Sequence, residues 1–247
     1  MRASKRKSTT KKTTGAKRKR RILLLDDHSV MRQGLKAIIN HEPDLAVCGE
    51  AADARTALTM VEKAWPDLIL VDISLPGTNG IEFIKNLKSR YPEVSAVVLS
   101  MHDESLYAER ALRAGALAYI QKKECAVELL KGIRSALKGD YHLSPLVSGD
   151  IFCRFFGRNP ENTSLLSVLS DRELEVFELL GRGLGRADIA AELNVSPKTI
   201  DAHKEQMKRK LGLASSRDLG RETARWVEKG GTNADDTFEP RSGNAGK

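Results

Sequence analysis

Four short strand-like runs, each followed by polar side chains, constrain the fold of this chain more than any other feature. The runs occupy 22–25, 68–71, 96–99 and 118–121, and the polar residues that follow them are Asp26 and Asp27, Asp72, Ser100, and Lys122. In an open parallel sheet the carboxyl ends of the strands converge on one crevice, where ligands bind. Three carboxylates, a hydroxyl and an ammonium group meeting there predict a site for a divalent metal ion and a phosphoryl group.

Helical patterns separate these runs. Helices are expected at 29–40, 54–64, 81–90, 104–114 and 126–138, with an additional short strand at 45–48. Asp53 suits the start of its helix because an Asp side chain can accept a hydrogen bond from the free N–H groups of a first turn. Five strand–helix repeats with almost continuously apolar strands predict an α/β fold, a doubly wound five-stranded parallel sheet covered by helices on both faces.

The C-terminal part of the chain has only helical patterns. Ser170 and Glu173 have the spacing of a capping box. Pro197 stands at the first position of a later helix, and Gly212 stands at its end. An all-α domain of four helices is expected, with one helix starting at Ser170 and the others at 185–193, 197–211 and 216–229.

The domain organisation follows from length and composition. A chain of 247 residues suits two domains of about 100–150 residues each. Between the two patterned regions, Pro and Gly residues with scattered aromatics mark a linker. The expected divisions are a basic disordered tail at 1–20, an α/β domain at 21–140, a linker at 141–167 with a partial helix at 145–156, an all-α domain at 168–230 and a disordered tail at 231–247.

The basicity of the chain is concentrated in its N-terminal tail. The net charge is +8, but residues 1–20 contain ten Lys or Arg and no acid, so the other 227 residues carry a net −2. Two interpretations of the tail stay open, a nonspecific nucleic-acid arm that binds through counterion release and a solvated extension. A transit peptide is disfavoured because the tail lacks an amphipathic pattern.

Nothing in the pattern indicates a membrane or secreted protein. No apolar run approaches the roughly 18 residues of a membrane span, and no apolar region follows the basic N-terminus as in a secretory signal. Cys48, Cys125 and Cys153 are far apart and form no metal-ligand spacing, so they are interpreted as reduced thiols. We therefore expect a cytoplasmic protein with no membrane partner.

The strand-end residues, in this order on these strands, resemble the receiver domain of two-component response regulators, a flavodoxin-like fold. The resemblance covers about residues 21–140. It implies that Asp72 is the phosphoacceptor, whose carboxylate attacks phosphorus and becomes an acyl phosphate. It also implies a bound Mg²⁺, which prefers oxygen ligands and offsets repulsion between the carboxylate and the phosphoryl group. The implied ligands are Asp26, Asp27, Asp72 and the backbone carbonyl of Ser74.

The same resemblance implies roles for three further residues. Lys122 would place a point charge on one phosphoryl oxygen, and Ser100 would donate its hydroxyl to another. In this family the Ser or Thr hydroxyl moves toward the phosphoryl group while an aromatic ring, three residues before the Lys, swings inward. Tyr119 occupies that aromatic position. The alternative is a half-buried amphipathic tyrosine without a switching role.

Three residues near the expected site depart from the family pattern or have no role in it. Lys123 stands where many receivers have proline. Met101 stands where many have a small residue, and its bulk would slow phosphoryl access or hydrolysis. His102 is interpreted as a loop residue rather than a catalytic base.

Residues 169–229 resemble the four-helix LuxR-type DNA-binding domain. The segments that carry the resemblance are 169–176, 183–190, 195–204 and 210–213. The second helix of a helix-turn-helix places its N-terminal part at base edges in the major groove. Ile200, Met207 and Leu211 define the buried face of that helix. The residues then expected to face DNA are Lys198, Thr199, Asp201, Ala202, Lys204, Glu205, Lys208 and Arg209.

Two acidic residues distinguish this DNA-facing side. Asp201 and Glu205 stand where some relatives have lysine, and a carboxylate accepts a hydrogen bond from cytosine N4 but repels a phosphate. Residues 170–229 carry a net charge of only +1, so modest DNA affinity is expected. On the last helix, Leu219 and Trp226 form either a dimer face or part of the domain core.

A receiver followed by this domain is the NarL/FixJ architecture. It implies a phosphorylation-controlled transcription regulator rather than an enzyme. A sensor histidine kinase would phosphorylate Asp72, and the receiver would then release DNA-binding helices that it had masked. The released protein would form a homodimer and bind double-stranded DNA. Two alternatives stay open, an orphan receiver with vestigial DNA binding and a phosphatase; the latter would need an acid where Ser74 stands.

Overall fold

The computed structural model describes residues 18–144, 148 and 165–229. Almost all of both predicted tails, and the predicted partial helix at 145–156 apart from one residue, lie outside the described residues. No helix in the described part of the chain combines the length and apolar character needed to span a bilayer.

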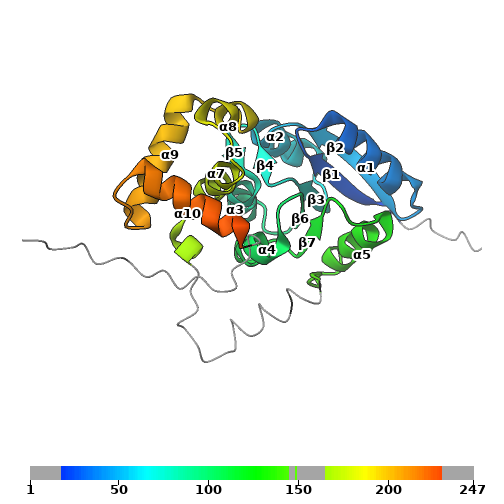
Figure 1. Cartoon of the computed structure of the whole chain (residues 1–247). Coiled ribbons are helices and arrows are strands. Elements are labelled where there is room, and N and C mark those ends of the chain that lie inside the picture. The colour runs from blue at the N-terminus through cyan, green and yellow to red at the C-terminus, as the bar shows by residue number, and fades with distance from the viewer. Residues whose placement is uncertain (1–17, 145–147, 149–164, 230–247) are drawn as a thin grey trace, which may run out of the picture.

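A five-stranded parallel sheet forms the centre of the N-terminal domain (Figure 1). Its strands, in spatial order, are β2 (Leu45–Ala51), β1 (Arg20–Leu25), β3 (Leu68–Val71), β6 (Ser95–Ser100) and β7 (Ala118–Gln121), and each neighbouring pair is parallel. This confirms the predicted doubly wound α/β sheet. The strand order reverses between β1 and β3, and ligands bind outside the carboxyl ends of the strands at such a reversal.

Helices cover both faces of the sheet (Figure 1). The elements on one face are α1 (Ser29–His41) and α5 (Ala126–Ala136), and those on the other are α2 (Ala54–Ala64), α3 (Gly80–Arg90) and α4 (Glu104–Arg113). Along β1, Ile22 and Leu24 belong to the core under α1 and α5. Leu23 and Leu25 belong to the core on the opposite face, because successive strand residues point to opposite sides. An apolar strand is therefore buried on both sides.

The chain makes a tight excursion after β3 that brings α3 against the end of this strand. This excursion contains a two-stranded hairpin, β4 (Ser74–Leu75) and β5 (Thr78–Asn79), with Gly77 at a φ of 75°. At the start of α3, a Cβ on Gly80 would lie 2.0 Å from the carbonyl oxygen of Asp72. Only glycine permits this approach, so Gly80 helps to set the position of Asp72.

The C-terminal domain confirms the predicted all-α fold of four helices. After a 3-10 turn, η1 (Leu165–Val168), its helices are α7 (Asp171–Gly181), α8 (Arg186–Glu192), α9 (Pro197–Lys210) and α10 (Ser216–Glu228). Ser170 and Glu173 form the capping box of α7. Pro197 opens α9 after Ser196, whose hydroxyl accepts a hydrogen bond from the Thr199 N–H. These helix starts follow from local sequence because the caps satisfy N–H groups that the helix itself leaves free.

Leu219 and Trp226 belong to the core of this domain. Leu219 is 0% exposed and Trp226 is 7% exposed. The Trp226 ring packs edge-on against Phe177 of α7, with ring centroids 5.7 Å apart. The interpretation as domain core is therefore the one that the structure bears out, and these two side chains are not available as a dimer face.

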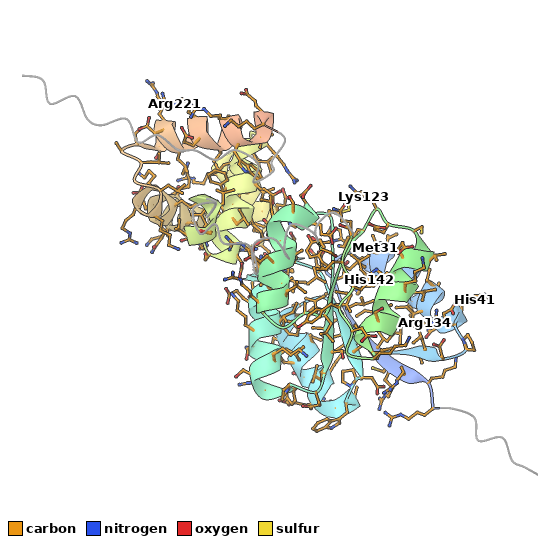
Figure 2. The ribbon with its side chains drawn as sticks, turned by 90° about the horizontal axis from the view of Figure 1, so that it is seen from below. Met31, His41, Lys123, Arg134, His142 and Arg221 are labelled. Carbon is orange, nitrogen blue, oxygen red and sulfur yellow. The ribbon has the colours of Figure 1, made fainter. Side chains whose placement is uncertain are left out.

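The two domains lie against each other through α7. Figure 1 shows α7 next to α3 and the β4–β5 hairpin, with α9 on the outer side of the molecule. In the turned view of Figure 2, Arg221 marks the far side of the C-terminal domain, and His41 and Arg134 mark the opposite end of the N-terminal domain. A backbone hydrogen bond from the Gly77 N–H to the Leu193 carbonyl, 3.3 Å long, also joins the domains.

Candidate phosphorylation site and DNA-binding helix

The carboxyl ends of β1 and β3 bring three aspartates together. Asp26, Asp27 and Asp72, joined by His28, each offer a ligand atom, and these atoms lie within 4.8 Å of one another. Asp26 and Asp72 are buried, with 3% and 4% of their surfaces exposed. His28 is not among the site residues predicted from the sequence, and its ring nitrogen lies 2.8 Å from an Asp27 carboxylate oxygen. Its only signal in the sequence is its place directly after the aspartate pair.

The oxygen atoms of this cluster suit a hard cation. Asp26 Oδ2 and Asp27 Oδ1 are buried and accept no hydrogen bond. They lie 2.8 Å from Lys122 Nζ and from His28 Nδ1 respectively, but not in hydrogen-bonding geometry. Carboxylate oxygens are among the ligands that Mg²⁺ prefers. The cluster is therefore typical of a Mg²⁺-binding phosphorylation site, and its donor set fits that metal.

Lys122 joins the aspartates as their counter-charge. Its Nζ donates a hydrogen bond of 2.6 Å to Asp72 Oδ2, and its side chain is only 4% exposed. Burial raises the pKa of Asp72 to about 6, although the neighbouring ammonium group acts in the opposite direction. Burial alone would lower the pKa of Lys122, but the charges of Asp72 and Asp26 outweigh it and raise that pKa. The site thus holds more negative charge than one lysine neutralises.

Ser100 and Tyr119 lie beside this cluster on neighbouring strands. Ser100, at the end of β6, is fully buried, and its Oγ accepts a hydrogen bond of 3.2 Å from the His102 N–H. The Tyr119 side chain is 2% exposed, and its hydroxyl donates a 3.0 Å hydrogen bond to the His102 carbonyl. Burial raises the pKa of Tyr119 well above its usual range. The tyrosine ring is therefore buried rather than half-buried, and its switching role stays a prediction.

His102 has a larger role than the sequence suggests. It lies in a loop, as expected, but only 8% of its surface is exposed. Its Nε2 lies 2.8 Å from Ser74 Oγ, and its Nδ1 lies 2.7 Å from an oxygen of Glu178 in α7. Burial alone would lower the pKa of His102, but the Glu178 carboxylate outweighs it and raises that pKa. No local pattern could have identified this residue, since its main partner is 76 positions away.

The two other unusual residues next to the site face solvent. Met101 is 73% exposed, and Lys123 is exposed as well. Together with Trp226 and Val227 of α10, they line a cleft of about 310 Å³ between the domains. Because its side chain points to solvent, Met101 does not fill the space around Ser100.

On α9 the predicted DNA-facing residues divide into exposed and partly buried ones. Ile200 and Met207 are completely buried, and Leu211, beyond the end of the helix, is partly buried. The exposed residues are Lys198, Ala202, Glu205 and Arg209, and the partly buried ones are Thr199, Asp201, Lys204 and Lys208. One side of α9 therefore packs into the domain while the other presents its side chains to solvent.

The two acidic residues of α9 are held by ion pairs. Asp201 accepts a 2.8 Å hydrogen bond from Arg186 at the start of α8, with both side chains about half exposed. Glu205 pairs with Lys208 one turn away, at 2.8 Å, and the Lys208 side chain is only 16% exposed. Lys208 is thus less available to a phosphate than its position on the helix predicts.

Comparison with known proteins identifies both domains. Residues 22–134 match the family model of the response regulator receiver domain, and residues 167–223 match that of the bacterial regulatory proteins of the luxR family. Over 199 residues the chain is 35% identical to the oxygen regulatory protein NreC of Staphylococcus aureus (strain MRSA252), covering 78% of this chain and 92% of NreC. The chain belongs to the two-component response regulators. It is a NarL-type regulator, a family of transcription regulators rather than enzymes.

Solved structures of this family share the architecture. One is RcsB of Salmonella enterica serovar Typhimurium bound to the promoter rprA in the presence of the phosphomimetic BeF₃⁻. It is 25% identical, has a TM-score of 0.57 and matches over 83% of this chain and 98% of RcsB. A second, of two RcsB dimers bound to two parallel DNAs, is also 25% identical, with a TM-score of 0.52 and coverage of 83% and 98%. This regulator accordingly binds DNA through its LuxR-type helix-turn-helix and acts in phosphorylation-dependent regulation, with a histidine kinase as the implied partner.

The receiver domain of this regulator covers α7 rather than α9, the recognition helix that is predicted to enter the major groove. Hydrogen bonds and ion pairs across the domain boundary involve Asp171, Glu175 and Glu178 of α7. Within the described residues, none of those identified involves α9, whose outward side chains stay exposed. The expectation that the receiver masks the DNA-binding helices therefore needs correction for the recognition helix itself. The reason is that the charged groups of the receiver face lie opposite the acids of α7.

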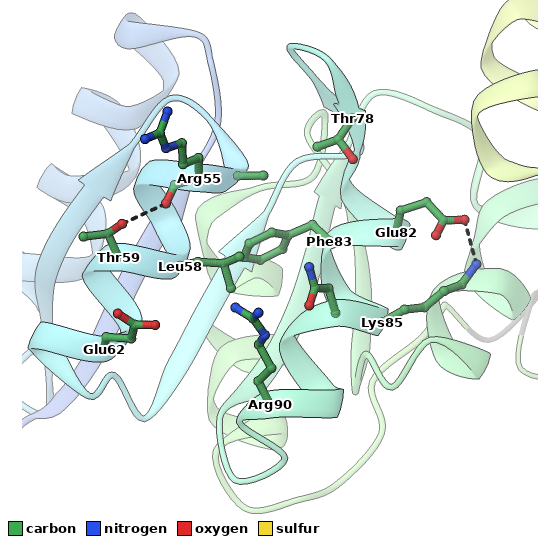
Figure 3. Close-up of a pocket in the computed structure, with 11 residues that line it drawn as sticks. Arg55, Leu58, Thr59, Glu62, Thr78, Glu82, Phe83, Lys85 and Arg90 are labelled. Carbon is green, nitrogen blue, oxygen red and sulfur yellow. Dashed lines mark hydrogen bonds and ion pairs between the residues drawn. The ribbon is translucent and has the colours of Figure 1, made fainter.

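A second hollow of the receiver, shown in Figure 3, lies apart from this chemistry. It is an open groove of about 680 Å³ between α2 and α3, with Leu58 and Phe83 at its floor and Arg55 and Arg90 at its margins. Its lining includes none of Asp26, Asp27, Asp72, Ser100 and Tyr119. The groove is thus separate from the phosphorylation site.

Proposed function

We propose that this regulator is switched by transfer of a phosphoryl group from a sensor histidine kinase to Asp72. The observation that carries the proposal is the convergence of Asp26, Asp27 and Asp72 with Lys122 at the switch point of the sheet. An Asp72 carboxylate oxygen would form a bond to phosphorus while the bond from phosphorus to the donor nitrogen breaks. A Mg²⁺ ion held by Asp26, Asp27, Asp72 and the Ser74 carbonyl would neutralise charge during this transfer.

The side chains around Asp72 would each serve this reaction. Lys122 already contacts an Asp72 oxygen, so it is placed to bind a phosphoryl oxygen once the carboxylate has become an acyl phosphate. Ser100 would donate its hydroxyl to another phosphoryl oxygen, which requires its Oγ to exchange the His102 N–H for the new partner. Tyr119, bonded to the same His102 backbone, would respond to that change.

The output would be DNA binding by a phosphorylated homodimer. The RcsB structures with promoter DNA and with BeF₃⁻, and of RcsB dimers on DNA, support this assignment. On α9, Lys198 and Arg209 would contact phosphates, and Asp201 would read a cytosine from a position set by Arg186. The domain limits that we propose are 21–140 for the receiver and 168–230 for the DNA-binding domain. A kinase substrate that binds DNA in this way would work in the cytoplasm.

The test is phosphorylation of the purified chain with acetyl phosphate and Mg²⁺, followed by intact mass and duplex DNA binding. We expect a gain of one phosphoryl group and tighter DNA binding, with both lost in Asp72→Asn because an amide oxygen cannot replace the nucleophile. A phosphodonor response that persists in Asp72→Asn would refute the assignment. A mass gain with unchanged DNA binding would instead favour an orphan receiver that acts on a protein partner, which the acids on α9 would also suit.

A further inference from the structure

Helix α7 carries an unusual number of buried acids at the domain boundary. Asp171, Glu175 and Glu178 are 2%, 0% and 4% exposed. On an isolated domain they would be expected on the solvent side, because carboxylates are rarely buried without partners. Here each has a partner in the receiver, while Glu175 and Glu178 also pair with Arg172 and Arg182 of their own domain.

Glu178 connects α7 with the switch residues through His102. One Glu178 oxygen lies 2.7 Å from His102 Nδ1 and also accepts a 2.7 Å hydrogen bond from the Tyr107 hydroxyl. The backbone of the same histidine binds both Ser100 and Tyr119. Any movement of Ser100 or Tyr119 toward a phosphoryl group therefore disturbs the residue that holds Glu178.

Glu175 reaches the phosphorylation site from the same helix. Its Oε1 accepts a 3.0 Å hydrogen bond from Ser74 Oγ, and Ser74 is two residues beyond Asp72. Because Ser74 donates to Glu175, the His102 ring donates to Ser74 in turn. Phosphorylation raises the negative charge at Asp72 from about one to about two. The Glu175 carboxylate opposes such a group by charge repulsion, which is strong where water is excluded.

We propose that α7 inhibits the phosphorylation site itself, with Glu175 and Glu178 as positioning residues that hold Ser74 and His102 in the arrangement of the unphosphorylated receiver. The DNA-binding domain then lowers the rate at which Asp72 accepts a phosphoryl group. The rate is lowered because the docked carboxylates oppose the negative charge that the phosphoryl group brings to the transition state, and for the equilibrium the coupling between two sites is reciprocal. A phosphoryl group that weakens the docking of α7 must bind less favourably while α7 is docked. This inference rests on the proposed phosphorylation of Asp72.

A second anchor holds α7 without touching the site. Asp171 accepts hydrogen bonds from Lys85 of α3 at 2.8 Å and from Arg110 of α4 at 3.0 Å. The same Arg110 also donates to the carbonyls of Leu166 and Leu169. Docking can therefore be weakened in two ways, at the switch network and at this remote ion pair.

The experiment compares phosphorylation rates of full-length variants with acetyl phosphate and Mg²⁺, measured by intact mass over time. We expect Glu178→Gln and Glu175→Gln to react about fivefold faster or more, which corresponds to removing about 1 kcal/mol from the activation free energy. Asp171→Lys places a cation against Lys85 and Arg110, so it should undock α7 and accelerate the reaction as well. Glu192→Gln is the matched control, since Glu192 is an exposed acid on α8.

Hydrogen exchange at α7 measures the undocking of this helix separately from the phosphorylation rate. If the glutamates had only a structural role, the two quantities would not be correlated. Variants with faster hydrogen exchange at α7 should also be phosphorylated faster. Phosphorylation of the wild type should itself raise the exchange rate at α7. Undocking in Asp171→Lys with a wild-type rate would overturn the inference, even if the glutamate variants fold poorly. No mass gain in any protein, the wild type included, would instead count against the proposed function on which the inference rests.

Discussion

At the scale of residues, the environment that makes Asp72 a candidate phosphoacceptor also makes its ionised form unfavourable. Burial raises its pKa to about 6, and Lys122 and Asp26 lie against it. A carboxylate that is poorly solvated and faces a second carboxylate is costly to ionise. A bound cation relieves this cost, so the site is arranged to favour a metal-bound state over the empty, ionised one.

The pH dependence of stability should reveal this cost. The folded-state pKa of Asp72, about 6, lies above its ordinary value of 3.8, so the folded protein binds that proton more tightly than the unfolded chain. The resulting stabilisation is complete below about pH 4 and is lost as the pH rises through 6. In Asp72→Asn the penalty is absent. Without divalent metal at pH 7.5, this variant should be more stable by up to about 3 kcal/mol.

Thermal denaturation in a metal chelator would check this expectation at pH 7.5 and again near pH 4.5, where the difference between the proteins should shrink. Addition of Mg²⁺ at pH 7.5 should raise the melting temperature of the wild type more than that of Asp72→Asn. Equal stability of the two proteins at pH 7.5 without metal would contradict the raised pKa.

At the scale of elements, the start of α3 determines where the end of β3 lies. A Cβ on Gly80 would meet the Asp72 carbonyl oxygen at 2.0 Å, and backbone atoms cannot move aside as a flexible side chain can. We expect Gly80→Ala to destabilise the receiver by about 2 kcal/mol or more and to slow phosphorylation by displacing Asp72. Gly34→Ala is the matched control, since a Cβ there meets nothing within 4 Å.

Chemical denaturation with parallel phosphorylation assays would measure both effects. Gly34 lies inside α1, where alanine should instead add up to about 1 kcal/mol of stability. A Gly80→Ala protein with unchanged stability and unchanged phosphorylation would show that the α3 start does not set the position of Asp72.

The recognition helix α9 allows phosphate contacts to be separated from base reading. Lys198 is exposed at the N-terminal end of the helix, so Lys198→Ala should weaken binding to all sequences similarly and reduce the salt slope by about 1. Asp201→Asn should change the preferred base at one position with less effect on nonspecific binding. Selection from a randomised duplex pool at two salt concentrations would distinguish the two. Identical preferences of Asp201→Asn and wild type would argue against base reading by Asp201.

At the scale of the whole molecule, a feature could be predicted from the sequence where neighbouring residues determine it. A feature that depends on a contact with a distant segment could not be predicted. The aspartates, Ser100 and Lys122 follow apolar strands directly, so their convergence could be inferred from the sheet alone. The link between His102 and Glu178 could not, because it joins two domains across 76 positions and each residue looks ordinary in its own segment. Leu219 and Trp226 show the same limit. Their spacing predicts an apolar face but not whether its partner is Phe177 or another chain.

The exposure of α9 in the docked arrangement has a consequence for how the regulator responds to its signal. A recognition helix that stays uncovered lets a single, unphosphorylated copy sample DNA weakly, so activation need not create the contact from nothing. Under the proposed function, what changes is the pairing of copies. If two phosphorylated chains must occupy adjacent half-sites, promoter occupancy rises with roughly the square of the phosphorylated concentration while the protein is scarce. A small change in kinase activity then produces a steeper change in transcription than a simple unmasking of one helix would.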